Sequence, residues 1–161
     1  MKFISLPGVL LQSCFEHGGR TYPEEACGVL SGPADDDTLT GFHPIENTLA
    51  GLHQQDPERY PRTPREGYVL DAGAHVRLER ELAGRGEKIK VIYHTHVDVG
   101  AYFSEEDSTQ ATWGGEPLFP GMFYLVCGVK NLRSDGAILA TFDLATGRFE
   151  EQRIAPAGEG D

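Results

Sequence analysis

The chain has 161 residues and a formal net charge of −11 at pH 7, with 14 Lys and Arg against 25 Asp and Glu. This length suits one domain with its own core, and no apolar run approaches the ~20 residues of a membrane span. The acidic balance and the lack of a basic stripe disfavour nucleic acid, whose phosphates would be repelled. We therefore expect one globular domain over residues 1–155, without a membrane or nucleic-acid partner, and a disordered polar tail over 156–161.

Apolar residues recur at helical spacing near the N-terminus and predict an amphipathic helix over about residues 6–17. This segment has a single lysine and no small-residue cleavage site, so it differs from a secretory signal and favours a cytoplasmic protein. A short apolar run then predicts a buried strand over 26–31, directly after Glu25. A second strand is expected over about 38–46.

The three cysteines, Cys14, Cys27 and Cys127, are an odd number without metal-type spacing. Each lies in an apolar run, where a free cysteine behaves as a small hydrophobic residue. No histidine stands at the spacing that would make Cys27 a nucleophile. We therefore interpret all three as reduced core thiols rather than as members of a disulfide.

Residues 47–70 are the least regular part of the sequence, because three prolines divide a charged segment dotted with aromatic residues. A connection of this length is usually functional or mobile. Asn47 and the proline-rich part could line a groove that binds substrate, or the segment could be a variable surface loop. The sequence leaves both interpretations open.

The rest of the chain alternates between helices and strands. Asp71 suits the N-cap of a helix that ends at Gly84. The strand that follows shows the two-residue alternation of a β-strand. The alternation predicts that one face of this strand carries Ile89, Val91 and Tyr93, and that the other face carries Lys88, Lys90 and Ile92.

A helix is expected from Ser104 to about Trp113, with the tryptophan packed beneath it, and three strands are expected over 122–129, 137–144 and 148–154. The element order is α-β-β-loop-α-β-α-β-β-β, which defines a mixed α/β (α+β) fold class.

Two histidines stand at the end of the strand over 88–93. His94 and His96 are two residues apart, so a strand points both imidazoles to one side and Thr95 to the other. Both nitrogens could then reach one ion at the ~2.0–2.1 Å that zinc prefers. Asp107, at the start of the next helix, could supply a third ligand. Two histidines and one carboxylate leave a fourth position for water, as in catalytic zinc sites.

Structural explanations exist for the same residues. An H-x-H pair alone is common, and the run from Ser104 to Asp107 resembles a helix start with an N-cap and an acidic first turn. The two interpretations are compatible, because a rigid helix N-terminus can aim a ligand. Four histidines outside the cluster fit surface or turn positions more simply: His17, His43, His53 and His75.

The full pattern, H-x-H-x7-S-x-x-D, resembles the signature of the JAMM (MPN+) metalloproteases. The matching residues are His94, His96, Ser104 and Asp107. The family also has an upstream glutamate in an E-x-C-G setting, which Glu25 matches; the neighbouring Glu24 is the alternative. The resemblance spans roughly residues 6–130. It implies a curved, mostly antiparallel sheet flanked by helices, similar to cytidine deaminase, and hydrolysis of peptide or isopeptide bonds.

The resemblance also implies roles for these residues. His94, His96 and Asp107 would hold one Zn²⁺, Glu25 would act as general base, and Ser104 would donate a hydrogen bond to the water or the oxyanion. The substrates of such enzymes are typically cleaved after the C-terminal Gly-Gly of ubiquitin-like proteins.

The small size and the sequence around the histidines look like the bacterial branch of the family. That branch trims or releases conjugates of ubiquitin-like sulfur-carrier proteins (ThiS/MoaD-like), which would be the partner here. Many members have Ser and Pro where this chain has Thr95 and Val97, so the loop over 97–103 is expected to differ in shape. Within it, Asp98 and Tyr102 could contact substrate or could be solvated loop residues.

Other functions remain alternatives. The fold also occurs in non-catalytic scaffold or binding modules, which typically lose the ligands, and a general small-peptide zinc peptidase would use the same site. A zinc deaminase needs H-x-E with P-C-x-x-C, and neither is present. A DNA-repair-associated relative usually carries a histidine–asparagine–histidine motif, unlike the sequence around Thr95. Oligomeric state is not indicated.

Overall fold

Strands from both halves of the chain meet in one sheet in the computed structural model, which describes residues 2–154. The helices are α1 (Gly8–Thr21), α2 (Leu49–Gln55), α3 (Ala72–Ala83) and α4 (Glu105–Gln110). The strands are β1 (Cys27–Pro33), β2 (Gly41–Ile45), β3 (Glu87–Val97), β4 (Thr112–Trp113), β5 (Glu116–Pro117), β6 (Phe123–Lys130), β7 (Arg133–Asp143) and β8 (Arg148–Ile154). The tail expected to be disordered, 156–161, lies outside the described residues.

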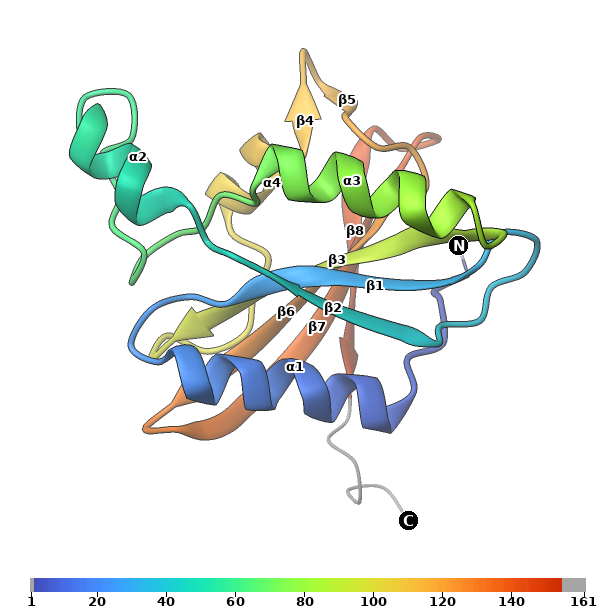
Figure 1. Ribbon diagram of the computed structural model, residues 1–161, viewed down its shortest axis with the longest axis horizontal. Helices are drawn as coiled ribbons and strands as arrows, with labels where there is room; N and C mark the ends of the chain where they lie inside the picture. The colour runs from blue at the N-terminus through green and yellow to red at the C-terminus, as the bar shows by residue number, and fades with distance from the viewer. Residues whose placement is uncertain (1, 155–161) are drawn as a thin grey trace.

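The main sheet has six strands in the order β2-β1-β3-β6-β7-β8, and every neighbouring pair is antiparallel except β3 and β6. Helix α1 covers one face, and α3 and α4 lie on the other (Figure 1). Each face carries its own apolar cluster, one against α1 and one beneath α3. This arrangement confirms the predicted mixed α/β fold with a mostly antiparallel sheet flanked by helices.

Strand β3 is the centre of the sheet and is buried on both faces from Ile89 to Val97. Val91 and Tyr93 join the cluster against α1, while Ile89 joins the cluster on the opposite face. The predicted grouping of Ile89 with Val91 and Tyr93 is therefore wrong. A register shift between β1 and β3 at this point inserts an extra residue, Lys90, and reverses the side-chain alternation.

The predicted helix from Ser104 to Trp113 is too long. Helix α4 ends at Gln110, and the next residues form a two-stranded hairpin, β4–β5, through Gly114 and Gly115, which both have positive φ. Trp113 lies on this hairpin and is 82% exposed, so the expectation that it packs beneath the helix is also wrong. The segment 47–70, expected to be irregular, contains the short helix α2. Within residues 2–154, no helix is both long and apolar enough to cross a membrane.

Helix α1 approaches β3 closely at Gly18. A Cβ atom there would lie 2.7 Å from Thr95 Cγ2 and 2.9 Å from Val129 Cγ2, whereas a Cβ atom on Gly19 would meet nothing within 4 Å. Gly18→Ala should therefore lower the free energy of unfolding by about 1–3 kcal/mol through overpacking.

Gly19→Ala is the matched control, because it adds the same methyl group to the same helix. It should raise the free energy of unfolding by up to about 1 kcal/mol through helix propensity. Urea unfolding of both variants measures the difference. Equal stability changes would contradict the close packing of α1 on β3.

Candidate metal centre and its cleft

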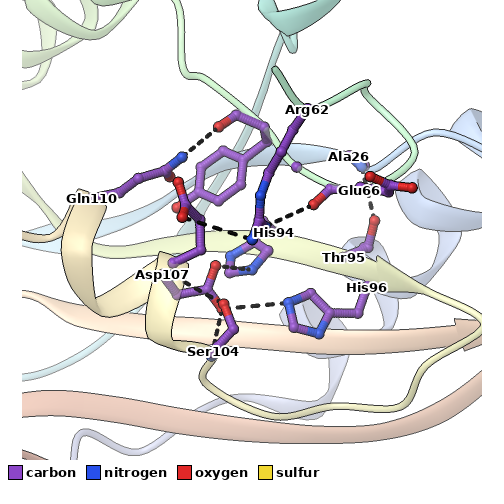
Figure 2. A network of polar contacts seen from close by, with 12 residues as sticks. Ala26, Arg62, Glu66, His94, Thr95, His96, Ser104, Asp107 and Gln110 are labelled. Atoms are coloured by element: carbon purple, nitrogen blue, oxygen red, sulfur yellow. Dashed lines mark hydrogen bonds and ion pairs between the residues drawn. The ribbon is translucent and has the colours of Figure 1, made fainter. Parts of the chain in front are cut away.

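His94 and His96 lie near the end of β3, and both imidazoles approach the carboxylate of Asp107 (Figure 2). Because the residue between them lies beside Gly18 of α1, the imidazoles point to the opposite face of the sheet. Thr95, between them, accepts a hydrogen bond from the Ala26 N–H at 2.8 Å on the other side of the strand. Both histidines are buried, with 0% and 5% of their surface exposed. The two-residue period of the strand therefore brings the imidazoles together as predicted, with ring centroids 5.0 Å apart.

Asp107 reaches the histidines from the first turn of α4. Its N–H donates to Ser104 Oγ at 3.0 Å, and its Oδ2 accepts from the Ser104 N–H at 2.9 Å, so the pair forms a capping box. The carboxylate then places Oδ1 3.2 Å from His94 Nε2 and Oδ2 3.4 Å from His96 Nε2. The capping box that starts α4 therefore also positions the Asp107 carboxylate beside the two histidines, so the structural and the ligand interpretations of this run are compatible, as the sequence allowed.

One ligand atom from each of His94, His96 and Asp107 lies within 4.8 Å of the others. His94 Nε2 has no hydrogen-bond partner in the described part of the chain, because its approach to Asp107 lies outside hydrogen-bond geometry. His96 Nδ1 lies 3.2 Å from the Gly100 carbonyl oxygen, which fixes this nitrogen as the donor and leaves Nε2 with a lone pair. A buried nitrogen without a partner costs free energy, and a metal ion would satisfy it. The donor set therefore fits a metal.

The electrostatics of the triad also suit metal binding. Burial lowers the pKa of His94 despite the opposing charge of Asp107, so this imidazole is neutral, which is the form that binds metals. Burial alone would raise the pKa of Asp107, but the two imidazoles and the Ser104 N–H hold it well below its usual range. The triad thus presents the neutral imidazole of His94, the Nε2 atom of His96 and one carboxylate.

Glu25 precedes β1 and lies on the same face of the sheet as the histidines. Cys27 pairs with His94 and the Thr95 N–H donates to the Ala26 carbonyl, so Glu25 falls opposite His96. Glu25 is only 5% exposed and lines the cleft beside the triad, whereas Glu24 is exposed. Burial, and then the charge of Asp107, raise the pKa of Glu25 to about 9.

The cleft beside the triad has a volume of about 450 Å³. Its lining includes the triad residues His96 and Asp107, the buried Glu25, and Ser104. The Ser104 oxygen accepts from the helix backbone, so its O–H remains able to donate into the cleft. Asp107 also lines a second, largely apolar cavity of about 500 Å³, so the two hollows meet at the candidate metal centre.

The three weaker candidates occupy different places. Asn47 donates to the Glu25 and Gly67 carbonyls and accepts from two backbone N–H groups, so its side chain positions backbone beside the site. Asp98 and Tyr102 line the cleft. Tyr102 is 48% exposed, and its ring lies edge-on to His96 with centroids 4.7 Å apart.

Other sequence predictions about histidine and cysteine have clear outcomes. All three cysteines are free and buried, and burial raises the pKa of Cys27 to about 12, as expected for core thiols. His75 was expected at a surface or turn position but is buried in α3, where its ring packs against Phe119 with centroids 5.5 Å apart. The remaining histidines are partly buried and hydrogen-bonded rather than surface residues: His17, His43 and His53.

Residues 59–69, here called the bridging segment, contribute side chains that the sequence analysis did not single out. Arg62 lies 3.7 Å from Glu106 of α4, and Arg65 lies 3.4 Å from Asp98 in the loop after β3 (Figure 2 labels Arg62). Tyr68 stacks on His94 with ring centroids 4.3 Å apart. Three arginines within seven residues of an acidic chain were the available signal in the sequence.

A metal-type His-His-Asp triad at the end of a central strand, with a buried glutamate in the same cleft, defines a domain of the JAB (MPN+) class. The family model for prokaryotic homologs of the JAB domain matches residues 7–137. The chain belongs to this family, which confirms the resemblance seen in its motif.

Two curated relatives have named activities. A desampylase from Haloferax volcanii is 31% identical over 105 residues, which cover 65% of this chain and 63% of the relative. A CysO-cysteine peptidase from Mycobacterium tuberculosis is 34% identical over 103 residues, which cover 64% and 62%. The matches thus span slightly less than two thirds of these relatives' lengths.

Solved structures show the same fold at lower identity. A protein from Desulfitobacterium hafniense superposes with a TM-score of 0.67 at 19% identity, covering 95% of this chain and 92% of its own. A protein from Salinibacter ruber gives a TM-score of 0.61 at 24% identity, covering 98% and 94%. At these identities the likeness supports the fold alone.

The raised pKa of Glu25 predicts that this residue lowers the free energy of unfolding of the metal-free protein in a pH-dependent way. The pKa of the Glu25 carboxyl is about 4.5 in the unfolded chain and about 9 in the folded protein. Folding therefore becomes less favourable as the pH rises between these two values. Glu25→Gln removes this titration and should stabilise the metal-free protein by about 2–3 kcal/mol at pH 7, with little effect at pH 4.

Urea unfolding in the presence of a chelator at several pH values measures this effect. Glu24→Gln is the control, because Glu24 is exposed and should show no such trend. A Glu25→Gln effect that does not grow with pH would contradict the buried, hard-to-ionise carboxyl.

Proposed function

We propose that the protein is a zinc-dependent hydrolase that cleaves the amide bond after the C-terminal Gly-Gly of a ubiquitin-like or sulfur-carrier protein. The observation that carries this proposal is the convergence of the His94, His96 and Asp107 ligand atoms within 4.8 Å, beside the buried Glu25. The named relatives, a desampylase and a CysO-cysteine peptidase, support an activity on small protein conjugates.

The donor set favours zinc over harder ions. Two imidazole nitrogens and one carboxylate form a three-ligand shell of the kind found in catalytic zinc sites, whereas Mg²⁺ and Ca²⁺ prefer oxygen ligands. Bound zinc would supply a Lewis acid and a water of lowered pKa, and its charge would favour the ionised form of nearby carboxylates.

The side chains around the triad have complementary roles in amide hydrolysis. Glu25, as a carboxylate, accepts a proton from the attacking water and passes it to the nitrogen of the leaving amine. The Ser104 O–H donates to the oxygen that gains negative charge when the water adds to the carbonyl. The C–N bond then breaks to give the carrier carboxylate and a free amine. Burial of Glu25 keeps competing water away from this proton transfer.

A scaffold function and a general peptidase are the alternatives. Scaffold members of the fold typically lose the ligands, while the triad and Glu25 are all in place here. A general peptidase would cleave short peptides as well as carriers, so substrate length separates it from the proposed function.

Glu25 and Asp107 should fail in different ways when substituted. Glu25→Gln should retain zinc but lose at least about 10²-fold in cleavage rate, because it removes the general base. Asp107→Ala should lose the metal, because two imidazoles alone hold zinc weakly. Zinc content by mass spectrometry, and cleavage of carriers extended beyond Gly-Gly by intact mass, test both.

Glu24→Gln is the control for Glu25→Gln and should keep both the zinc content and the cleavage rate of the wild-type protein. Full zinc occupancy in Asp107→Ala would refute its role as a ligand, and near-normal turnover in Glu25→Gln would refute the general base. If the zinc-loaded wild-type protein cleaves no carrier, the proposed function itself is wrong.

Ser104→Ala should reduce kcat by about 10²–10³-fold by removing a donor to the oxyanion. It also removes the α4 cap and should lower the free energy of unfolding by about 1 kcal/mol. Asp71→Ala is the matched control, because Asp71 caps α3 by accepting from two backbone N–H groups. If Asp71→Ala slows cleavage as much as Ser104→Ala, the serine effect comes from stability alone.

A further inference from the structure

The loop between β3 and α4, residues 98–104, turns back beside the candidate metal centre. Its Gly100 carbonyl oxygen lies 3.2 Å from His96 Nδ1 and is the hydrogen-bond partner of this imidazole. We propose that Asp98 is a positioning residue for the metal centre. Its carboxylate holds the β3–α4 loop so that the Gly100 carbonyl keeps the His96 proton on Nδ1 and leaves Nε2 free to bind the metal. The proposal rests on the metal site of the proposed function and adds a residue that acts through His96.

Asp98 joins the β3–α4 loop to two segments that lie at the same end of the molecule, the end of α1 and the turn between β6 and β7 (Figure 1). Its Oδ2 accepts from the Tyr22 hydroxyl at 2.7 Å, and its Oδ1 accepts from the Asn131 N–H at 3.3 Å. Its own N–H donates to the Val129 carbonyl at 2.8 Å. One residue therefore ties the start of the loop both to α1 and to the sheet.

The bridging segment adds a weaker contact to the same carboxylate. Arg65 Nη2 lies 3.4 Å from Asp98 Oδ2, and 58% of the arginine side chain is exposed. An exposed ion pair of this kind contributes little, because water screens it. The Tyr22 hydroxyl and the backbone groups are therefore the contacts that hold Asp98.

The backbone around Asp98 adopts a conformation that needs such anchors. Among residues 2–154, the non-glycine residues with positive φ are Asp98, Asn131 and Leu132, at 62°, 49° and 65°. This conformation is unfavourable for residues with a Cβ atom and persists where surrounding contacts fix it. Because the Asp98 carboxylate accepts from the Asn131 N–H, one hydrogen bond links the two places where the positive φ values occur.

The middle of the β3–α4 loop lies against β6, at a residue without a side chain. Gly128 of β6 pairs with His96 of β3 in the register of the sheet. A Cβ atom on Gly128 would collide with the Asp135 carbonyl oxygen and would lie 3.1 Å from the Ala101 nitrogen. The loop therefore passes directly over β6 beside His96, which places the preceding carbonyl, that of Gly100, at Nδ1.

The two histidines of the triad differ in this respect. Neither ring nitrogen of His94 has a hydrogen-bond partner among the described residues, and its ring stacks on Tyr68. A hydrogen bond from one ring nitrogen fixes the tautomer of a metal-binding histidine and the orientation of its ring. The β3–α4 loop supplies this bond to His96 alone, so loss of Asp98 should change His96 and leave His94 unaffected.

Long-range proton–nitrogen NMR of the metal-free protein tests the proposal without the metal, at alkaline pH, where imidazoles are neutral. His96 should carry its proton on Nδ1 in the wild-type protein. Asp98→Gly removes the carboxylate but tolerates the positive φ, so it should leave His96 as a mixture of both tautomers. Asp98→Asn keeps one acceptor oxygen and should retain most of the Nδ1-protonated form.

Chelator competition measures the consequence for zinc. Asp98→Gly should weaken zinc binding by about 10–100-fold, the range typical for loss of a group that orients a metal-binding histidine. Tyr22→Phe should weaken zinc binding by a smaller factor in the wild-type background. In the Asp98→Gly background it should have no further effect, because both changes act through the same carboxylate.

Asp143→Ala and Arg65→Gln are the controls. Asp143 accepts from the Ala145 N–H at 2.9 Å after β7, so its loss removes a comparable turn contact outside the metal centre. Arg65→Gln removes only the exposed contact to Asp98. Both variants should keep the wild-type tautomer of His96 and the wild-type zinc affinity.

The outcomes separate this proposal from the proposed function. A His96 proton on Nε2 in the wild-type protein overturns the proposal, and so does an unchanged tautomer or an unchanged zinc affinity in Asp98→Gly. An equal loss of zinc affinity in Asp143→Ala also overturns it, because the effect would then come from stability alone. A wild-type protein that has the expected tautomer but binds no zinc overturns the proposed function instead.

Discussion

The site depends on the two-residue side-chain period of β3, a strand buried on both faces. Because each face is covered, Thr95 must point to α1 and the imidazoles of His94 and His96 must point to the other side. A slip of one residue would reverse all three side chains and remove the triad. The close approach of Gly18 to Thr95 therefore supports the metal centre through the strand, although α1 contributes no residue to the triad.

Opposing electrostatic effects prepare the buried groups for chemistry. Burial raises the pKa of Glu25 and lowers that of His94, whereas imidazoles and a helix N–H keep Asp107 ionised. The unpartnered Nε2 of His94 adds a further cost in the metal-free state. Such unfavourable free-energy terms are typical of functional sites, and a bound cation would relieve them together.

Local patterns in the sequence predicted most of the element order, but not α2 or the β4–β5 hairpin, and they singled out the three residues whose ligand atoms converge. The H-x-H spacing required only a strand, and the run from Ser104 to Asp107 required only a helix start. Other features depend on tertiary contacts that no local pattern records. The bulge that moves Ile89 to the other face is set by pairing with β1, and the exposed Trp113 results from a hairpin that replaces the last turn of a predicted helix.

Zinc K-edge X-ray absorption of the zinc-loaded protein tests the central claim most directly. The proposed shell of His94, His96, Asp107 and one water predicts four light-atom ligands near ~2.0 Å, two of them with imidazole scattering. A sulfur ligand near ~2.3 Å, which would implicate Cys27, or a shell with no imidazole contribution would contradict this account of the site.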